Sequence, residues 1–174
     1  MNPVRIFFLA LLIFNLTCHL AHAQKLEKYY TQRVQEGGDI YFIQPNEDFQ
    51  NTDDRSGFVF DITYREGTEN ATLNFTFYTD DPVKAKFVEL TSGQKTVKAE
   101  AEKLYVDFVK KKWENRYTVQ VPFTSLHAIF GQPGTPVFTV KTETGSLVFS
   151  VKKRKWEKYS EAINKILYII SQNQ

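Results

Sequence analysis

The sequence has almost no cysteine, since Cys18 is the only one among its 174 residues. Cys18 falls within an N-terminal segment that we expect to be removed, so the mature chain would contain none. Disulfide bonds are therefore excluded as a source of stability. Zinc sites are disfavoured as well, because they draw mainly on Cys and His ligands. Stability must come from a buried apolar core, which a chain of this length can form as a single domain.

Histidine is nearly as scarce, and its scarcity removes much of the usual chemistry of enzymes. His19 and His22 precede the expected cleavage point, which leaves His127 as the only mature histidine. A catalytic triad would have to join His127 to Ser125 or to a more distant serine, and no nucleophile-elbow pattern is present. The sequence also lacks a glycine-rich phosphate loop. We therefore predict no nucleophilic catalytic residue and no cofactor.

Acidic residues remain as candidates for hydrolysis or metal binding. Glycoside hydrolysis requires two converging carboxylates, and the candidates on predicted strands or near their ends are Asp61, Glu89, Glu100, Glu102 and Asp107. Acids on solvated strand faces are common, so their presence alone predicts no site. The acidic loop of residues 47–54 offers oxygen ligands for calcium, but its spacing differs from that of a helix-loop-helix calcium site. We predict no catalytic residue and no metal site.

The N-terminus has the features of a cleaved signal peptide. Arg5 precedes an apolar run over residues 6–14, and Ala21-His22-Ala23 matches the small-x-small pattern of signal peptidase sites. Polar residues interrupt the stretch before it reaches the length of a membrane span. We predict a signal peptide over residues 1–23 and one β-rich domain over residues 24–174, with no transmembrane segment after cleavage. The junction with Gln24 is typical of Gram-negative export, so we expect a location in the periplasm or at the cell surface.

Alternating apolar residues predict that the mature chain is mainly β. The predicted antiparallel pairs are residues 58–64 with 72–78, 104–108 with 117–121, and 137–140 with 147–151. Further strands are expected near residues 39–44 and 83–87, whereas residues 26–34 fit either a strand or a short helix. Residues 46–57 show no apolar period and are predicted to form a polar loop. Short strands at this spacing predict an antiparallel β-sandwich or an open barrel of about seven to nine strands.

The last segment changes its period and predicts an amphipathic α-helix from about residue 155 to 171. Its apolar residues recur at steps of three and four, and they are Trp156, Tyr159, Ile163, Ile166, Leu167 and Ile170. Because the segment follows directly on the last strand, we expect this helix to pack across the sheet. Trp156 belongs to the apolar stripe and is expected to be structural.

Two similar basic segments are the strongest functional signal in the sequence. KKKWENRY spans residues 110–117 and KRKWEKY spans residues 153–159. The first is predicted to lie at a hairpin tip, where Trp113 has little core to enter, with its basic neighbours Lys110, Lys111, Lys112 and Arg116. Exposed Trp side chains bind sugar rings or lipid interfaces, and flanking cations attract anions. We predict these five residues as a binding surface, although lysines at a hairpin tip also serve to block aggregation of edge strands.

These features favour a non-enzymatic exported β-sandwich protein with a binding or scaffolding role at the bacterial envelope. Its expected partners are an envelope protein, an anionic glycan or lipid headgroups. Nucleic acid is not expected, because the mature net charge is only +1 and the compartment is wrong. Two alternatives are a small envelope hydrolase that acts on glycan or lipid, and an open-barrel carrier of an apolar ligand.

Overall fold

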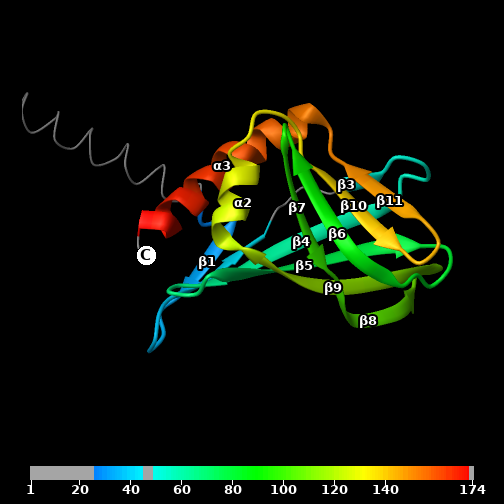
Figure 1. The fold of residues 1–174 in the computed structure, drawn as a ribbon, viewed down its shortest axis with the longest axis horizontal. Coiled ribbons are helices and arrows are strands. Elements are labelled where there is room, and N and C mark those ends of the chain that lie inside the picture. The colour runs from blue at the N-terminus through cyan, green and yellow to red at the C-terminus, as the bar shows by residue number, and fades with distance from the viewer. Residues whose placement is uncertain (1–25, 45–48, 173–174) are drawn as a thin grey trace, which may run out of the picture.

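The structure, a computed structural model, describes residues 26–44 and 49–172. The predicted signal peptide, with Cys18, lies outside the described residues. Within them, eleven strands form one antiparallel sheet that curves until it is nearly closed as a barrel (Figure 1). The strands are β1 (Tyr30–Arg33), β2 (Ile40–Ile43), β3 (Phe49–Asn51), β4 (Gly57–Arg65), β5 (Asn70–Thr79), β6 (Ala85–Ser92), β7 (Lys95–Glu100), β8 (Glu102–Val109), β9 (Lys112–Pro122), β10 (Val137–Thr142) and β11 (Ser146–Ser150).

Nine of these strands follow one hydrogen-bonded path, in the order β7-β6-β10-β11-β3-β4-β5-β9-β8, and the β1–β2 hairpin joins the sheet beside β4. The two ends of the path, β7 and β8, are consecutive in the chain and meet at Ala101. The Ala101 N–H still donates to the Lys86 carbonyl of β6, whereas Glu102 pairs with Thr118 of β9. The chain therefore changes partner at this point, and the barrel is closed by chain continuity rather than by a full ladder of hydrogen bonds.

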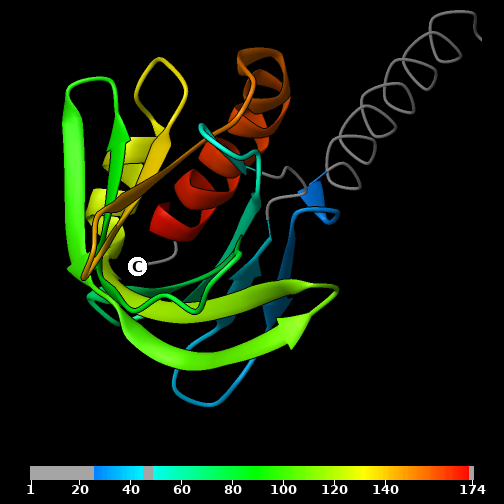
Figure 2. The ribbon, with the colours of Figure 1, turned by 90° about the vertical axis from the view of Figure 1, so that its right-hand side faces the viewer.

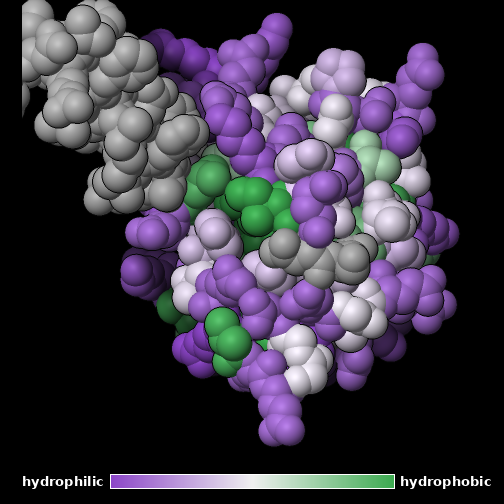
Figure 3. Space-filling model, turned by 90° about the vertical axis from the view of Figure 1, so that its left-hand side faces the viewer, coloured by the Kyte–Doolittle hydropathy of each residue, from purple (hydrophilic) through white to green (hydrophobic). Residues whose placement is uncertain are grey.

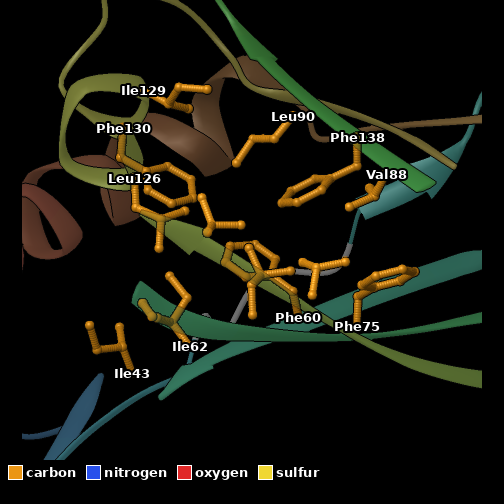
Figure 4. Packing of buried hydrophobic residues seen from close by; sticks show 14 of the residues in the cluster. Ile43, Phe60, Ile62, Phe75, Val88, Leu90, Leu126, Ile129, Phe130 and Phe138 are labelled. Atoms are coloured by element: carbon orange, nitrogen blue, oxygen red, sulfur yellow. The ribbon is translucent and has the colours of Figure 1, made fainter. Parts of the chain in front are cut away.

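Two helices cover one end of the barrel, α2 (Phe123–Phe130) and α3 (Lys153–Gln172) (Figures 1 and 2). The interior between sheet and helices is filled by side chains. Figure 4 shows Phe60 and Phe75 of the β4–β5 hairpin pointing toward Phe138 of β10 and Phe130 of α2. All four are buried and belong to one hydrophobic cluster. Burial of about thirty apolar side chains of this kind provides the main stabilisation of the fold.

The predicted fold class is confirmed, because the protein is mainly β and antiparallel with a helix packed on it. Of the two predicted architectures, the single curved sheet corresponds to the open barrel, so the expectation of a sandwich is wrong. The predicted C-terminal helix is confirmed within two residues at its start, and every residue of its predicted apolar stripe is buried.

Residues 46–57 are not wholly the polar loop that we predicted. Phe49 opens the short strand β3, and its side chain is completely buried. Its ring packs edge-on against Phe58, Phe60 and Phe138. The two inward side chains of this three-residue strand are Phe49 and the polar Asn51. One apolar residue is too few to produce an alternating hydrophobic pattern. The strand is held by long-range packing, which a local pattern cannot reveal.

Figure 3 views the molecule from the side at which α3 ends, and shows a hydrophobic area bordered by hydrophilic residues. Near this end of α3, Tyr168 and Ile169 expose much of their side chains. In the described ranges, neither helix combines the length and the apolar character that a membrane span requires.

Candidate binding site at the β8–β9 hairpin

The turn between β8 and β9 consists of Lys110 and Lys111 alone, since Val109 pairs directly with Lys112. Both turn residues have positive φ, 52° for Lys110 and 68° for Lys111. Two-residue turns of this kind strongly favour Asn-Gly, because the left-handed region is sterically costly for other side chains. A lysine in this region costs on the order of 1 kcal/mol or more. The turn thus places two exposed cations side by side at a cost in stability.

An aromatic pair lies directly beside this turn. Phe108 of β8 faces Trp113 of β9 across the hairpin, and their ring centroids are 5.3 Å apart. Trp113 is half-buried, whereas Phe108 leaves 57% of its surface exposed. Trp113 shares its side of β9 with the buried Asn115 and Tyr117, so the pair lies on the inner side of the sheet where the hairpin extends past the core. The aromatic pair is therefore an apolar surface at the rim of the barrel.

The base of the hairpin is fixed by buried polar contacts. The Asn115 side chain is completely buried and its amide donates to Thr79 Oγ1 at 2.9 Å, while its oxygen accepts from the Val83 N–H at 3.4 Å. The Tyr117 hydroxyl donates to the Val83 carbonyl and accepts from the Ala85 N–H. These bonds tie the segment before β6 to β9. They hold the hairpin at a defined position relative to the barrel.

Lys112 differs from the two turn lysines because it has an anionic partner. Its Nζ lies 2.6 Å from Asp80 Oδ1, and this hydrogen bond raises the pKa of Lys112 above its usual value. Lys112 also lines a shallow cleft of about 320 Å³ on the outer side of the hairpin, together with Tyr78, Val109, Lys110 and Glu114. Within the part of the chain that the structure describes, Lys110 and Lys111 form no ion pair. The unpaired positive charge of the hairpin is therefore concentrated at its turn.

The structure places Arg116 apart from the turn lysines with which the sequence analysis grouped it. It points to the outer side of the sheet, where its guanidinium lies 2.8 Å from Asp61 Oδ2 and 2.9 Å from Thr76 Oγ1. Asn74 donates to the other oxygen of Asp61. The sequence placed the hairpin tip over residues 110–115 and grouped Arg116 with it, whereas the strand already begins at Lys112. Arg116 lies three residues after Trp113, and so on the opposite side of β9.

The predicted group of Lys110, Lys111, Lys112, Trp113 and Arg116 is thus only partly brought together. The first four surround the turn, and Arg116 is engaged elsewhere. Sequence reasoning missed Phe108 and Val109, which are exposed next to the turn. The sequence could have indicated them, because they end a strand directly before two lysines. Apolar residues at such a position lie beyond the core and are expected to be exposed.

The second basic segment has a different structure, as the sequence predicted for its tryptophan. Trp156 is buried, with only 3% of its surface exposed, and its ring packs against Phe49, Phe130 and Tyr159. Its neighbours Lys152, Lys153, Arg154 and Lys155 are exposed around the start of α3. The resemblance between the two segments is therefore one of composition and not of structure.

The residues weighed for catalysis lie in ordinary structural settings. Asp61 is held by Arg116 and Asn74, and Asp107 accepts from the Phe108 backbone N–H. His127 is half-buried in α2, and its carbonyl accepts from the Gly131 N–H. In the loop weighed for calcium, Asn51 and Asp54 side chains cap the backbone of the turn itself. Among the described residues, no three His, Cys, Asp or Glu side chains gather in a way that could hold a metal.

Comparison with known proteins gave no match among protein families, curated sequences or solved structures. The function must therefore be argued from the residues of this chain.

Proposed function

We propose that this protein is an exported, non-enzymatic binding protein of the Gram-negative envelope, and that its β8–β9 hairpin binds anionic lipid headgroups. The observation that supports the proposal is the composition of the turn. Two lysines without ion-pair partners in the described residues occupy backbone positions that disfavour them. Exposed Phe108 and Val109 lie directly beside them.

Lipid headgroups suit this surface better than the other partners considered from the sequence. Interfacial binding combines shallow insertion of aromatic and aliphatic side chains with attraction between Lys and anionic lipids. Each Lys near such a surface contributes about 1 kcal/mol. An anionic glycan would use the cations and the aromatic pair, but it would leave the aliphatic Val109 without a role. A protein partner would be expected to bury a broader surface than one turn.

The two alternative functions have weaker support. A hydrolase requires two free, converging carboxylates, whereas Asp61 and Asp107 are engaged by Arg116, Asn74 and the Phe108 N–H. A carrier requires interior space, whereas aromatic rings and α3 fill the barrel. Neither alternative is favoured by a particular observation.

Cosedimentation with vesicles tests the proposal. The secreted form, residues 24–174, should bind vesicles of phosphatidylcholine mixed with phosphatidylglycerol, and should bind pure phosphatidylcholine weakly. Added salt should weaken binding, because exposed charges are screened. The double variant Lys110→Glu/Lys111→Glu should lose at least about tenfold in affinity, since two favourable contributions of about 1 kcal/mol are removed and repulsion is added.

A matched control is available on other strands. Lys86 of β6 and Lys95 of β7 are exposed, and Lys86→Glu/Lys95→Glu changes the net charge by the same amount. This control should bind nearly as well as the unmodified protein. Equal losses in both double variants would reduce the effect to net charge and contradict a site at the hairpin. Binding to a soluble anionic polysaccharide, without binding to vesicles, would contradict the lipid proposal and favour a glycan.

A further inference from the structure

A second basic surface, distinct from the one at the hairpin, lies at a cleft between the β3–β4 turn and the start of α3. The cleft has a volume of about 310 Å³. Its lining combines three basic side chains with polar groups, and consists of Gln50, Asn51, Thr52, Arg55, Ser150, Val151, Lys152 and Lys155. It shares no residue with the cleft at the hairpin. No carboxylate is among these lining residues, so the lining carries a net positive charge.

The basic side chains reach the cleft from two separate segments. Arg55 belongs to the turn between β3 and β4, whereas Lys152 and Lys155 come from the passage of β11 into α3. In the described ranges, neither the Arg55 guanidinium nor the Lys152 ammonium makes an ion pair. Like charges held close together raise the free energy of the folded state, and a bound anion would relieve that repulsion.

The polar lining is held in place by the backbone. The Asn51 side chain is buried, and its oxygen accepts from the Asp53 N–H at 2.8 Å. The Thr52 N–H donates to the Val148 carbonyl, which ties the turn to β11. The Arg55 N–H donates to the Asn51 carbonyl. The turn that carries Arg55 is therefore fixed next to β11, and the cleft does not depend on a chance arrangement of long side chains.

We propose that this cleft binds the phosphate group of a small phosphate ester. A guanidinium offers paired donors that match phosphate oxygens, and an ammonium adds a compact charge. The volume lies at the lower limit of small-molecule pockets and exceeds the needs of a bare phosphate ion. Gln50, Thr52 and Ser150 provide uncharged polar groups for the rest of such a molecule. The first turn of α3 contains no acidic residue that would compete for the cations.

Isothermal titration calorimetry with inorganic phosphate and with glycerol 3-phosphate tests the proposal at constant ionic strength. Both probes should show saturable binding. Arg55→Asn removes the charge and suits the left-handed backbone at this position, where φ is 60°. This variant and Lys152→Gln should each weaken binding by about tenfold, as expected for the loss of one hydrogen bond to a charged group.

Lys158→Gln is the matched control, because Lys158 is exposed on α3 and does not line the cleft. It should bind both probes as the unmodified protein does. Lys110→Glu/Lys111→Glu should also retain phosphate binding, which separates this proposal from the one for the hairpin. The absence of saturable binding to either probe would overturn the proposal, as would equal weakening by Lys158→Gln and the two cleft variants.

Discussion

The ring of Trp113 lies against the ring of Phe108 across the β8–β9 hairpin, with centroids 5.3 Å apart and planes inclined at 57°. The contact shields one side of each ring and leaves most of Phe108 exposed. Trp156, the other tryptophan, packs against three buried aromatic rings. The two tryptophans therefore have different roles, one at the rim of the barrel and one in its core.

Substitution of each tryptophan by alanine should separate these roles. Trp156→Ala should lower the free energy of unfolding by about 3–5 kcal/mol, the usual cost of truncating a large buried aromatic side chain. Trp113→Ala should cost clearly less, because Trp113 is only half-buried, and should weaken vesicle binding. Urea unfolding measures the first effect and cosedimentation the second. A larger loss of stability in Trp113→Ala than in Trp156→Ala would reverse the assignment.

Leu167 tests whether α3 is an integral part of the core. Its side chain is completely buried on the face of α3 that packs into the barrel. Leu167→Ala should lower the free energy of unfolding by about 2–5 kcal/mol, because it removes buried methyl groups and leaves a cavity. Tyr168→Ala, at the exposed neighbouring position, is the control and should change stability little. An unchanged unfolding midpoint for Leu167→Ala would show that α3 does not support the fold.

Tyr159 has a buried hydroxyl group, and none of the residues that the structure describes forms a hydrogen bond with it. Replacement by phenylalanine should raise the free energy of unfolding by about 1–3 kcal/mol, the desolvation cost of an unsatisfied polar group. Burial, with a smaller contribution from Tyr29, also raises the pKa of Tyr159 far above its usual value of 10.0. Above pH 10 the unfolded chain therefore loses this proton while the folded protein keeps it, so stability falls as pH rises.

Unfolding of the unmodified protein and of Tyr159→Phe at pH 8 and at pH 10.5 measures both effects. The stabilisation by phenylalanine should be larger at the higher pH, since the variant lacks the ionisable phenol. A destabilised Tyr159→Phe would show that the hydroxyl has a favourable partner, and would contradict this reading.

The turn lysines offer a test in which stability and binding should change in opposite directions. Lys110→Asn/Lys111→Gly introduces residues that suit the left-handed conformation of the turn, so it should raise the free energy of unfolding by about 1 kcal/mol or more. The same change removes both cations and should weaken vesicle binding. If the variant were more stable and bound vesicles normally, the lysines would serve only to protect the edge strand.

Substitution of Arg116 should lower the free energy of unfolding and leave vesicle binding unchanged. Arg116→Gln breaks the half-buried ion pair with Asp61, and we expect a loss of about 1 kcal/mol, because both side chains remain partly exposed to solvent. Vesicle binding should equal that of the unmodified protein, since Arg116 is engaged by Asp61 and Thr76 and does not line the cleft beside the turn. A loss of binding in Arg116→Gln would return this residue to the binding surface.

The sequence predicted those parts of the fold whose pattern is local. The β4–β5 hairpin was predicted because Phe58, Phe60 and Ile62 fall on one face of an alternating stretch, and the structure pairs these strands in register. Strand β7 was missed, because it forms a sheet edge and only Val97 and Ala99 of its six residues pack toward the core. Nothing in its composition separates such a strand from a polar loop.

The hairpin was predicted with too wide a tip for a related reason. Asn-Gly would have located the turn, whereas Lys110-Lys111 is not a recognised signal for it. The error shifted Trp113 out of the strand and grouped Arg116 with the cations of the tip. Trp113 faces Phe108 because of the register of β8 and β9. That register follows from the position of the two-residue turn, which the sequence did not reveal.

The emission of Trp113 in the presence of vesicles tests the central claim most directly. Trp156→Phe leaves Trp113 as the only tryptophan of the chain. If the hairpin binds anionic lipid, vesicles containing phosphatidylglycerol should shift the emission of Trp113 to shorter wavelength and protect it from iodide, and Phe108→Ala should reduce both effects. Tyr168→Ala is the control, because Tyr168 is as exposed as Phe108, at 57%. Vesicle binding with unchanged Trp113 emission and unchanged iodide quenching would contradict the account, because the protein would then bind through another surface.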